Sequence, residues 1–378
     1  MSDVCTKCFQ DRIARNFIKA HGTIGDCDFC GSRNRKVIHA YRLHDLFEEV
    51  VSLYRLYEPP PGSESWGGDT LAECLAEWEI FPEDGDEKQQ NEILDAIMGY
   101  DPRDGDVSAS EDWQAKSDHW TTTPMDQRWP WFADYLKRSR RFIIEEDSSG
   151  EIVRPETWVP DLLTEASAIR EITTRTRLYR GRLGVAVDVN GRRMPRSSEE
   201  MGAPPSKLGT AGRANPGGFS FLYCALEAET AIVETGRFPG AEVSLRELRA
   251  RKTLRLADLR GRKSILEPLD TSNLADEVQK RTLLGSLGRA LGEPVHPEDS
   301  HIEYIPTQYL AEVIRAEGYD GICYPSALNQ TGTNVVIFDP QLIRITRRGW
   351  VFELGRAEYT IHPKPEFVTK PHSKGHRR

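Results

Sequence analysis

The chain has 378 residues, of which 38% are hydrophobic, and a formal net charge of −9 at pH 7. This length suffices for two domains and a small additional module. The acidic balance argues against a nucleic-acid-binding surface over the whole molecule, and no apolar run approaches the roughly 18–20 residues of a membrane span. The first residues lack the basic and apolar regions of a signal peptide, so we expect a soluble, cytoplasmic protein.

Four cysteines near the start form two C-x-x-C pairs, Cys5 with Cys8 and Cys27 with Cys30. This spacing is typical of a tetrathiolate zinc site. Two disulfides or a redox pair are the alternative, but the other three cysteines are scattered along the chain and intracellular thiols stay reduced. The sequence therefore predicts a closed, non-catalytic zinc knuckle over residues 1–35.

The next segment has a helical pattern. Apolar residues recur at helical spacing over residues 43–57, and a proline run beginning at Pro59 ends this helix. Further helices are predicted over residues 86–98 and from Pro130 onward. Six of the eight tryptophans precede residue 150, and they fit a tryptophan-anchored helical core better than a binding groove. We expect a helical N-terminal domain over residues 36–150.

Beyond a turn-forming cluster at residues 147–150, short strands and helices alternate. Strands are predicted over residues 176–183, 252–259, 321–324 and 334–338, and helices over 228–235 and 307–317. This mixed order indicates an α+β fold rather than a strict βαβ repeat, and we expect it over residues 151–350. Residues 351–378 should add a strand and a basic tail that is solvated, with nucleic-acid contact as a minor alternative.

Three stretches of the α+β segment have the composition of a site. The first contains Arg180 in Leu-Tyr-Arg-Gly, the second is a glycine-rich loop leading to Tyr223 and Glu234, and the third ends at Ser326 in Tyr-Pro-Ser. Each alone has an ordinary explanation as a solvated arginine, a turn or a surface carboxylate. No histidine lies between His119 and His296, which argues against a Ser-His-Asp arrangement.

Together these residue types suit the cleavage of an N-glycosidic bond in a dinucleotide. Arginines bind a diphosphate through forked, charge-assisted hydrogen bonds. A tyrosine can stack on a ring or bond to a ribose. A carboxylate can stabilise the oxocarbenium ion that develops as the bond breaks.

Residues from about 165 to about 345 resemble the RES domain, a family named for its arginine, glutamate and serine. Arg180, Glu234 and Ser326 match these three positions in order, and the Gly-Arg-Ala-Asn-Pro-Gly-Gly-Phe loop with Tyr223 matches the segment before the glutamate. Members of this family are similar in fold to ADP-ribosyltransferase toxins. They act as toxins of bacterial toxin–antitoxin systems and consume NAD by hydrolysis, phosphorolysis or ADP-ribosyl transfer.

The resemblance also implies roles for individual residues. The catalytic set would be Glu234, Arg180 and Ser326. The substrate-binding set would be Arg213, Tyr223, Tyr179 and Asn215. Arg180 and Arg213 would contact the phosphates, and Tyr223 and Ser326 would line the nicotinamide–ribose pocket. Glu229, on the same predicted helix as Glu234, is the second candidate for the carboxylate.

The first 150 residues resemble the helical domain that precedes RES and HEPN domains, here with a zinc knuckle at its front. The expected fold is therefore α+β: a RES/ADP-ribosyltransferase-like mixed β core with flanking helices, after a zinc ribbon and a helical domain. The expected function is that of an NAD-consuming toxin or effector with structural zinc, which cleaves the nicotinamide–ribose bond as a glycohydrolase or phosphorylase.

Two alternatives remain open. One is a protein ADP-ribosyltransferase that uses the same pocket, and the other is a non-enzymatic zinc-ribbon adaptor or nucleic-acid-binding protein. An antitoxin or regulatory protein is an expected partner. The N-terminal domain and an insertion between residues 183 and 212 depart from the short members of the family, and so leave open whether a separate antitoxin is needed.

Overall fold

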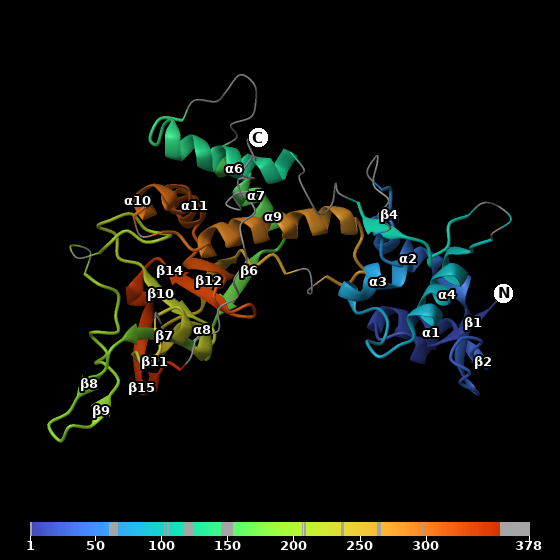
Figure 1. Ribbon diagram of the computed structural model, residues 1–378, viewed down its shortest axis with the longest axis horizontal. Helices are drawn as coiled ribbons and strands as arrows, with labels where there is room; N and C mark the ends of the chain where they lie inside the picture. Colours follow the sequence, from blue (N-terminus) through green and yellow to red (C-terminus); the bar gives the residue numbers. More distant parts are fainter. Residues whose placement is uncertain are drawn as a thin grey trace, which may run out of the picture.

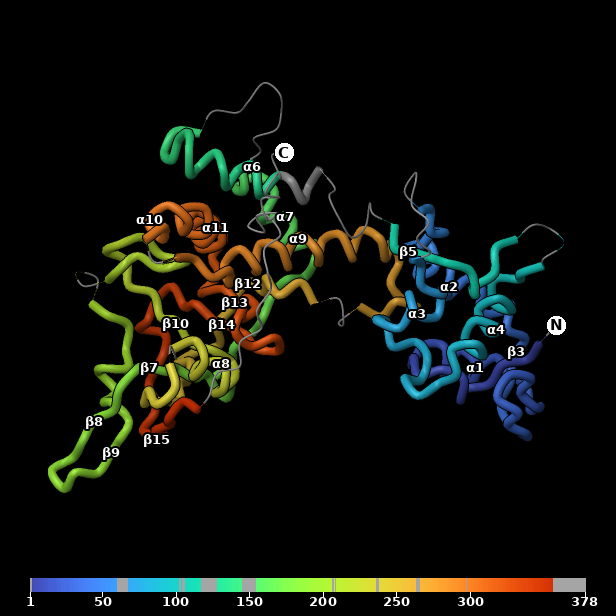
Figure 2. Tube along the Cα trace, viewed as in Figure 1, coloured from blue at the N-terminus to red at the C-terminus, as the bar shows by residue number. Residues whose placement is uncertain are grey.

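The computed structural model describes residues 2–59, 67–101, 103, 106–116, 124–144, 154–205, 207, 209–235, 238–262, 266–296 and 298–355. Figure 1 shows two lobes, a smaller one built from the N-terminal residues and a larger one built around a sheet. Helix α9 (Leu274–Gly292) runs from one lobe into the other, as the tube in Figure 2 also shows. Within the described ranges, no helix has both the length and the apolar character that crossing a membrane requires.

The smaller lobe combines short strands with helices. Its strands are β1 (Asp3–Cys5), β2 (Thr23–Gly25), β3 (Arg35–His39), β4 (Tyr54–Leu56) and β5 (Trp113–Ala115). Its helices are α1 (Arg12–His21), α2 (His44–Val51), α3 (Leu71–Leu75) and α4 (Glu87–Met98). Strands β1, β3 and β2 form one antiparallel sheet in that order, and β4 pairs with β5.

The predicted helix over residues 43–57 is too long. Helix α2 ends at Val51, and Tyr54–Leu56 instead forms strand β4 against Trp113–Ala115. The Tyr54 hydroxyl accepts a hydrogen bond of 2.9 Å from the indole nitrogen of Trp78, and both rings are buried. A strand partner almost sixty residues away therefore overrides the local helical periodicity.

An eight-stranded sheet forms the centre of the larger lobe. Its strand order is β15-β11-β7-β10-β14-β13-β12-β6. The strands are β6 (Ile169–Ile172), β7 (Leu178–Leu183), β10 (Leu222–Ala225), β11 (Glu242–Ala250), β12 (Leu254–Asp258), β13 (Gly321–Pro325), β14 (Thr333–Ile337) and β15 (Ile343–Glu353). Strands β12 and β13 run parallel, and the other neighbouring pairs are antiparallel. The mixed sheet confirms the predicted α+β class.

Helices pack on one face of the sheet. They are α8 (Ala228–Val233), α9 and α11 (Ile305–Ala316), with the short helices α7 (Val159–Glu165) and α10 (Ser300–Glu303) beside them. A buried cluster joins leucines of α9 and α11 to apolar residues of β12, β13 and β14. The opposite face of the sheet buries a second apolar cluster around Leu178, Leu256 and Ile337.

Helix α6 (Pro124–Arg138) joins the larger lobe, although it falls within the expected helical domain over residues 36–150. Its Trp129, Phe132 and Leu136 are buried in the same cluster as the leucines of α9 and α11. The packing boundary between the lobes therefore lies before α6. The expected domain edge at residues 147–150 lies outside the described residues.

Helix α9 takes part in both cores. Leu274 and Val278 in its first turns are buried in the core of the smaller lobe, whereas Leu287 and Leu291 are buried in the larger one. The amide of Leu274 also donates to the Glu49 carboxylate of α2 at 3.3 Å.

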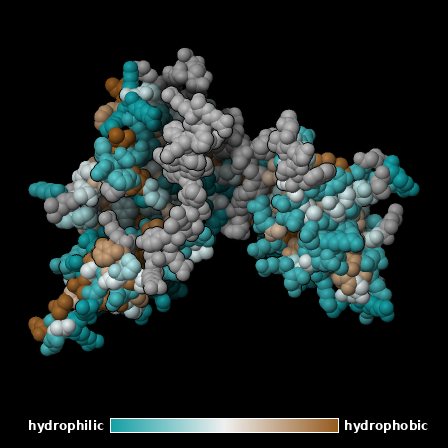
Figure 3. All heavy atoms as spheres, viewed as in Figure 1, coloured by the Kyte–Doolittle hydropathy of each residue, from teal (hydrophilic) through white to brown (hydrophobic). Residues whose placement is uncertain are grey.

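A hairpin of strands β8 (Ala186–Val187) and β9 (Arg193–Met194) projects from the larger lobe and occupies part of the predicted insertion. Its Val187 and Val189 are exposed. Figure 3 shows hydrophobic side chains on the projecting hairpin. The predicted C-terminal strand corresponds to the end of β15, and the predicted basic tail lies outside the described residues.

Candidate functional site

A cleft of about 320 Å³ opens where strands β7 and β10 separate. The two strands pair at a single position, Tyr179 with Ala225. The residues of the predicted site that line the cleft are Tyr179, Arg180, Arg213, Tyr223 and Glu234. These residues come from two strands, a loop and the end of a helix, so the fold brings together side chains that lie far apart along the chain.

Arg180 spans the gap between the separating strands. Its Nη1 donates to the main-chain oxygen of Tyr223 at 2.6 Å, and its Nε is buried without a hydrogen-bond partner. Burial lowers the pKa of Arg180 to about 10, with a further contribution from the neighbouring charge of Arg182, so the guanidinium still carries its charge at neutral pH. A half-buried cation with an unbonded donor at the wall of a cleft favours an anionic ligand.

A hydrogen-bonded loop fixes the ring of Tyr223. Its hydroxyl donates to Oδ1 of Asn215 at 2.7 Å and accepts from the amide of Ala214 at 3.0 Å. The side-chain nitrogen of Asn215 in turn donates to three main-chain oxygens of the same loop. Burial raises the pKa of Tyr223 to about 12, so this ring offers a neutral, fixed surface. Asn215 acts from behind Tyr223 and does not itself line the cleft.

Glu234 lies at the C-terminal end of helix α8, above the strands. A side chain on Gly181 of β7 would place its Cβ 2.3 Å from the main-chain oxygen of Ala231, so glycine at this position lets the helix approach the strand closely. Oε1 of Glu234 accepts hydrogen bonds from Oγ of Ser326 at 2.6 Å and from Nδ2 of Asn334 at 2.7 Å. The carboxylate is thereby held while the residue stays open to solvent.

The structure also shows which of the candidate side chains lie outside the lining of the cleft. Glu229 is exposed and does not line the cleft. Arg182, two residues after Arg180, donates to the main-chain oxygen of Gly202 instead. Ser326 is buried beneath Glu234.

The cleft residues that sequence reasoning missed include Tyr304, Tyr324 and Asn334. Tyr324 directly precedes the Pro325–Ser326 motif, so its position in the sequence was a usable signal. No sequence signal pointed to Asn334, because an asparagine near the start of an apolar strand is an ordinary strand-end residue.

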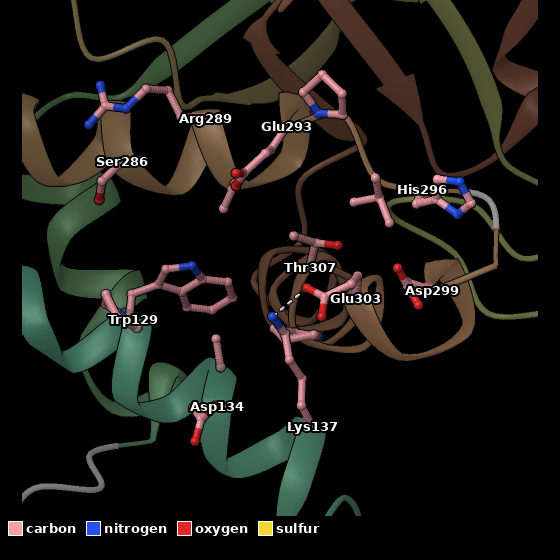
Figure 4. A pocket seen from close by; sticks show the side chains of 16 residues that line it. Trp129, Asp134, Lys137, Ser286, Arg289, Glu293, His296, Asp299, Glu303 and Thr307 are labelled. Atoms are coloured by element: carbon pink, nitrogen blue, oxygen red, sulfur yellow. Dashed lines mark hydrogen bonds and ion pairs between the residues drawn. The ribbon is translucent and has the colours of Figure 1, made fainter. Parts of the chain in front are cut away.

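Arg213 lines the cleft and bonds to a residue of a second, larger cavity. Its guanidinium lies over the ring of Tyr304 at 5.6 Å and donates to the main-chain oxygen of Glu293. The second cavity, about 670 Å³, lies between α6, the end of α9 and helices α10 and α11 (Figure 4). Lys137 and Glu303 form an ion pair of 2.5 Å within it. This larger cavity contains none of the predicted site residues, so we place the candidate site in the smaller cleft.

The four N-terminal cysteines form a separate cluster. The sulfurs of Cys5 and Cys30 lie 3.5 Å apart and those of Cys8 and Cys27 lie 3.6 Å apart, and all four sulfurs lie within 4.8 Å of one another. A regular tetrahedron with Zn–S bonds of about 2.3 Å has sulfurs about 3.8 Å apart. The four cysteines could therefore bind one zinc ion.

Comparison with known proteins gives a family match for part of the chain. Residues 190–356 match the family model described as the RES domain. This range contains Arg213, Glu234 and Ser326 but begins after Arg180, so the placement of Arg180 rests on the geometry of the cleft.

One similar solved structure is the crystal structure of the M. tuberculosis MbcT–MbcA toxin–antitoxin complex. The match has 15% sequence identity and a TM-score of 0.28, and it covers 51% of this chain and 92% of that chain. No curated protein sequence matches this chain.

Proposed function

We propose that the cleft binds NAD and breaks the bond between its nicotinamide and its ribose. The partial match to the RES domain and the charges of the cleft support this proposal. Neither Arg180 nor Arg213 has a carboxylate partner within the described residues, and both would bind the diphosphate. Tyr223 would pack against the nicotinamide riboside half of the molecule.

The fixed carboxylate of Glu234 is the observation that carries the proposal. Two donors hold Oε1, whereas Oε2 has no hydrogen-bond partner within the described part of the chain. When the glycosidic bond breaks, its electron pair leaves with nicotinamide and the ribose becomes cationic. A carboxylate already held in place stabilises that charge without having to reorient during the reaction. Water, phosphate or a protein side chain then supplies the group that attacks the sugar.

The direct test incubates the full chain with NAD in water, in phosphate buffer, and with candidate acceptor proteins. Mass spectrometry then distinguishes ADP-ribose, its phosphate ester and ADP-ribosylated protein. We expect nicotinamide release in at least one condition. If the full chain neither consumes NAD nor transfers ADP-ribose, the enzymatic proposal fails and a binding or adaptor role takes its place.

Glu234→Gln tests the carboxylate. Glutamine keeps the size of the side chain but removes the charge, so we expect nicotinamide release to slow by about 10²–10³-fold. Glu229→Gln is the matched control, because Glu229 lies on the same helix and is exposed outside the cleft. Equal activity of the two variants would exclude Glu234 as the catalytic carboxylate.

For the cysteine cluster we propose a structural zinc ion bound by Cys5, Cys8, Cys27 and Cys30. The sulfur spacing supports a closed site with four protein ligands, which leaves no position for a substrate. Such a metal would stabilise the smaller lobe, because the ligands come together only when the chain folds.

A further inference from the structure

Four arginines meet at a small pocket that is separate from the cleft. The pocket has a volume of about 200 Å³ and lies where strands β6 and β12 meet the middle of helix α9. Its arginines are Arg170 of β6, Arg260 and Arg262 of the loop after β12, and Arg281 of α9. None of these residues lines the proposed NAD cleft.

Arg281 is one of the two deeply buried arginines of the pocket, the other being Arg260. Its side chain is only 9% exposed, and its Nε is buried without a hydrogen-bond partner. The nearest ion-pair oxygen belongs to Glu277 and lies 3.9 Å from Nη2, which is longer than a hydrogen bond. The other carboxylate oxygen of Glu277 accepts a bond of 3.2 Å from Lys280. Arg281 therefore keeps a buried donor that a ligand in the pocket could satisfy.

The pocket has too few carboxylates for its arginines. Asp258 is the acidic residue of its lining, and both of its oxygens bond to the guanidinium of Arg260, which is itself almost fully buried. Burial lowers the pKa of Arg262, and the neighbouring charge of Arg260 lowers it further. Burial also lowers the pKa of Arg281. Like charges held close together in this way are stabilised by an anion placed between them.

We propose that this arginine pocket binds a small phosphorylated anion, independently of the NAD cleft. Arg281 would donate from the base of the pocket through Nε, while Arg170 and Arg262 would close over the anion at its mouth. Within the described residues, Arg170, Arg262 and Arg281 have no hydrogen bond to a carboxylate, and three such guanidiniums match a phosphate dianion better than a single carboxylate. The volume leaves room for a phosphate group with a small substituent such as a sugar.

The test measures ligand binding by calorimetry on the full-length protein at constant ionic strength. Inorganic phosphate and ribose 5-phosphate serve as the probes, and acetate and chloride as the comparison anions. We expect saturable binding of a phosphate probe with no comparable binding of acetate. Absence of saturable binding by either phosphate probe, or equal binding of acetate, would overturn the proposal.

Two arginine variants locate the bound phosphate. Arg281→Gln removes the deep donor and Arg262→Gln removes an exposed one, and each should weaken binding about 10-fold or more because a charge-assisted bond is lost. If Arg281→Gln does not fold, as judged by circular dichroism, Arg262→Gln decides the matter, because its side chain lies at the surface. Normal binding by a folded Arg262→Gln variant would also contradict the proposal.

Two further variants serve as controls. Arg344→Gln removes an exposed arginine of strand β15 and should leave binding unchanged. Arg180→Gln removes the half-buried arginine of the cleft and reports any phosphate that binds there instead. Binding lost in Arg180→Gln but kept in Arg281→Gln and Arg262→Gln would place the phosphate in the cleft and refute a separate arginine pocket. This outcome is distinct from a failure of the NAD proposal, which is measured by nicotinamide release.

Discussion

The cysteine cluster of the smaller lobe and the cleft of the larger lobe differ in how far apart their residues lie along the chain. The cluster takes all four side chains from one stretch of 26 residues, Cys5 to Cys30. The cleft takes its side chains from residues between Tyr179 and Asn334, carried by strands, a loop and a helix end. A motif of fixed spacing thus specifies the first site, whereas the pairing of distant strands specifies the second.

The two sites also differ in whether they contain polar atoms without a partner. The four sulfurs lie within reach of one central ion, so the cluster is complete in itself. In the cleft, Nε of Arg180 and Oε2 of Glu234 have no partner among the described residues. We infer that the first arrangement serves stability and the second serves a ligand, and this difference can be tested.

Loss of the metal should have the largest effect. Cys27→Ser removes one sulfur ligand, and binding of structural zinc contributes about 10–16 kcal/mol in small zinc-binding modules. We expect the variant to lose zinc, as measured by elemental analysis, and to lose hydrogen-exchange protection in the smaller lobe. The sheet of the larger lobe should keep its protection.

Cys74→Ser is the matched control for this experiment, because Cys74 lies in the same lobe outside the cluster. It should retain the metal. Wild-type protein purified under reducing conditions without zinc would contradict the metal assignment.

Shortening a buried side chain of α9, the helix shared by the two cores, should have the next largest effect on stability. Leu274→Ala and Leu291→Ala each remove a fully buried side chain from α9, at a typical cost of about 2–5 kcal/mol. The first should lower hydrogen-exchange protection chiefly in α2 and α4, and the second chiefly in α11 and β13. Identical exchange patterns in the two variants would show that the lobes unfold as one unit.

A smaller effect is expected from Ser326→Ala. The variant removes one of the two donors to Glu234, and a hydrogen bond to a charged group contributes about 1.5–3 kcal/mol. If Glu234 is the catalytic carboxylate, kcat for nicotinamide release should fall by roughly 10- to 100-fold. Ser286→Ala is the control, since that hydroxyl bonds to the main-chain oxygen of Leu283 in its own helix. A wild-type kcat for Ser326→Ala would show that Asn334 alone suffices to hold the carboxylate.

The smallest effect is expected from an exposed ion pair of the smaller lobe. Arg12 and Glu267 form an ion pair of 2.6 Å, but both side chains are exposed to water. Solvent and salt screen such pairs, so Arg12→Ala should leave the midpoint of thermal unfolding unchanged. A clear fall in the midpoint would mean that this pair stabilises the fold despite its exposure to water.

Sequence reasoning succeeded where a local pattern carries the information. Helix α4 begins within a residue of its predicted start, and strands β13 and β14 lie within a residue of their predicted ranges. The cysteine spacing likewise indicated which four side chains come together. A family resemblance linked the motifs around Arg180, Glu234 and Ser326; Arg180 and Glu234 line the same cleft, and Ser326 bonds to Glu234 from outside its lining.

Other parts depend on contacts that no local pattern reveals. Helix α9 escaped prediction because it is apolar on more than one side and carries glycines, which weaken a helix in isolation. A side chain on Gly288 would place its Cβ 2.0 Å from the main-chain oxygen of Leu259, so the glycine reflects tertiary packing. The arginine pocket could not be predicted from the sequence for the same reason, because Arg170 and Arg281 meet only through the packing of α9 on the sheet.

The position of α9 in both cores has a consequence for how the protein can be divided into fragments. A fragment that begins with α6 would retain all of α9 but lack the residues of the smaller lobe that cover its first turns. Leu274 and Val278, both fully buried in the intact chain, would then face water at one end of a projecting helix. We expect such a fragment to self-associate through that end. Loss of activity on removing the smaller lobe would therefore reflect an exposed helix end as readily as the loss of a regulator.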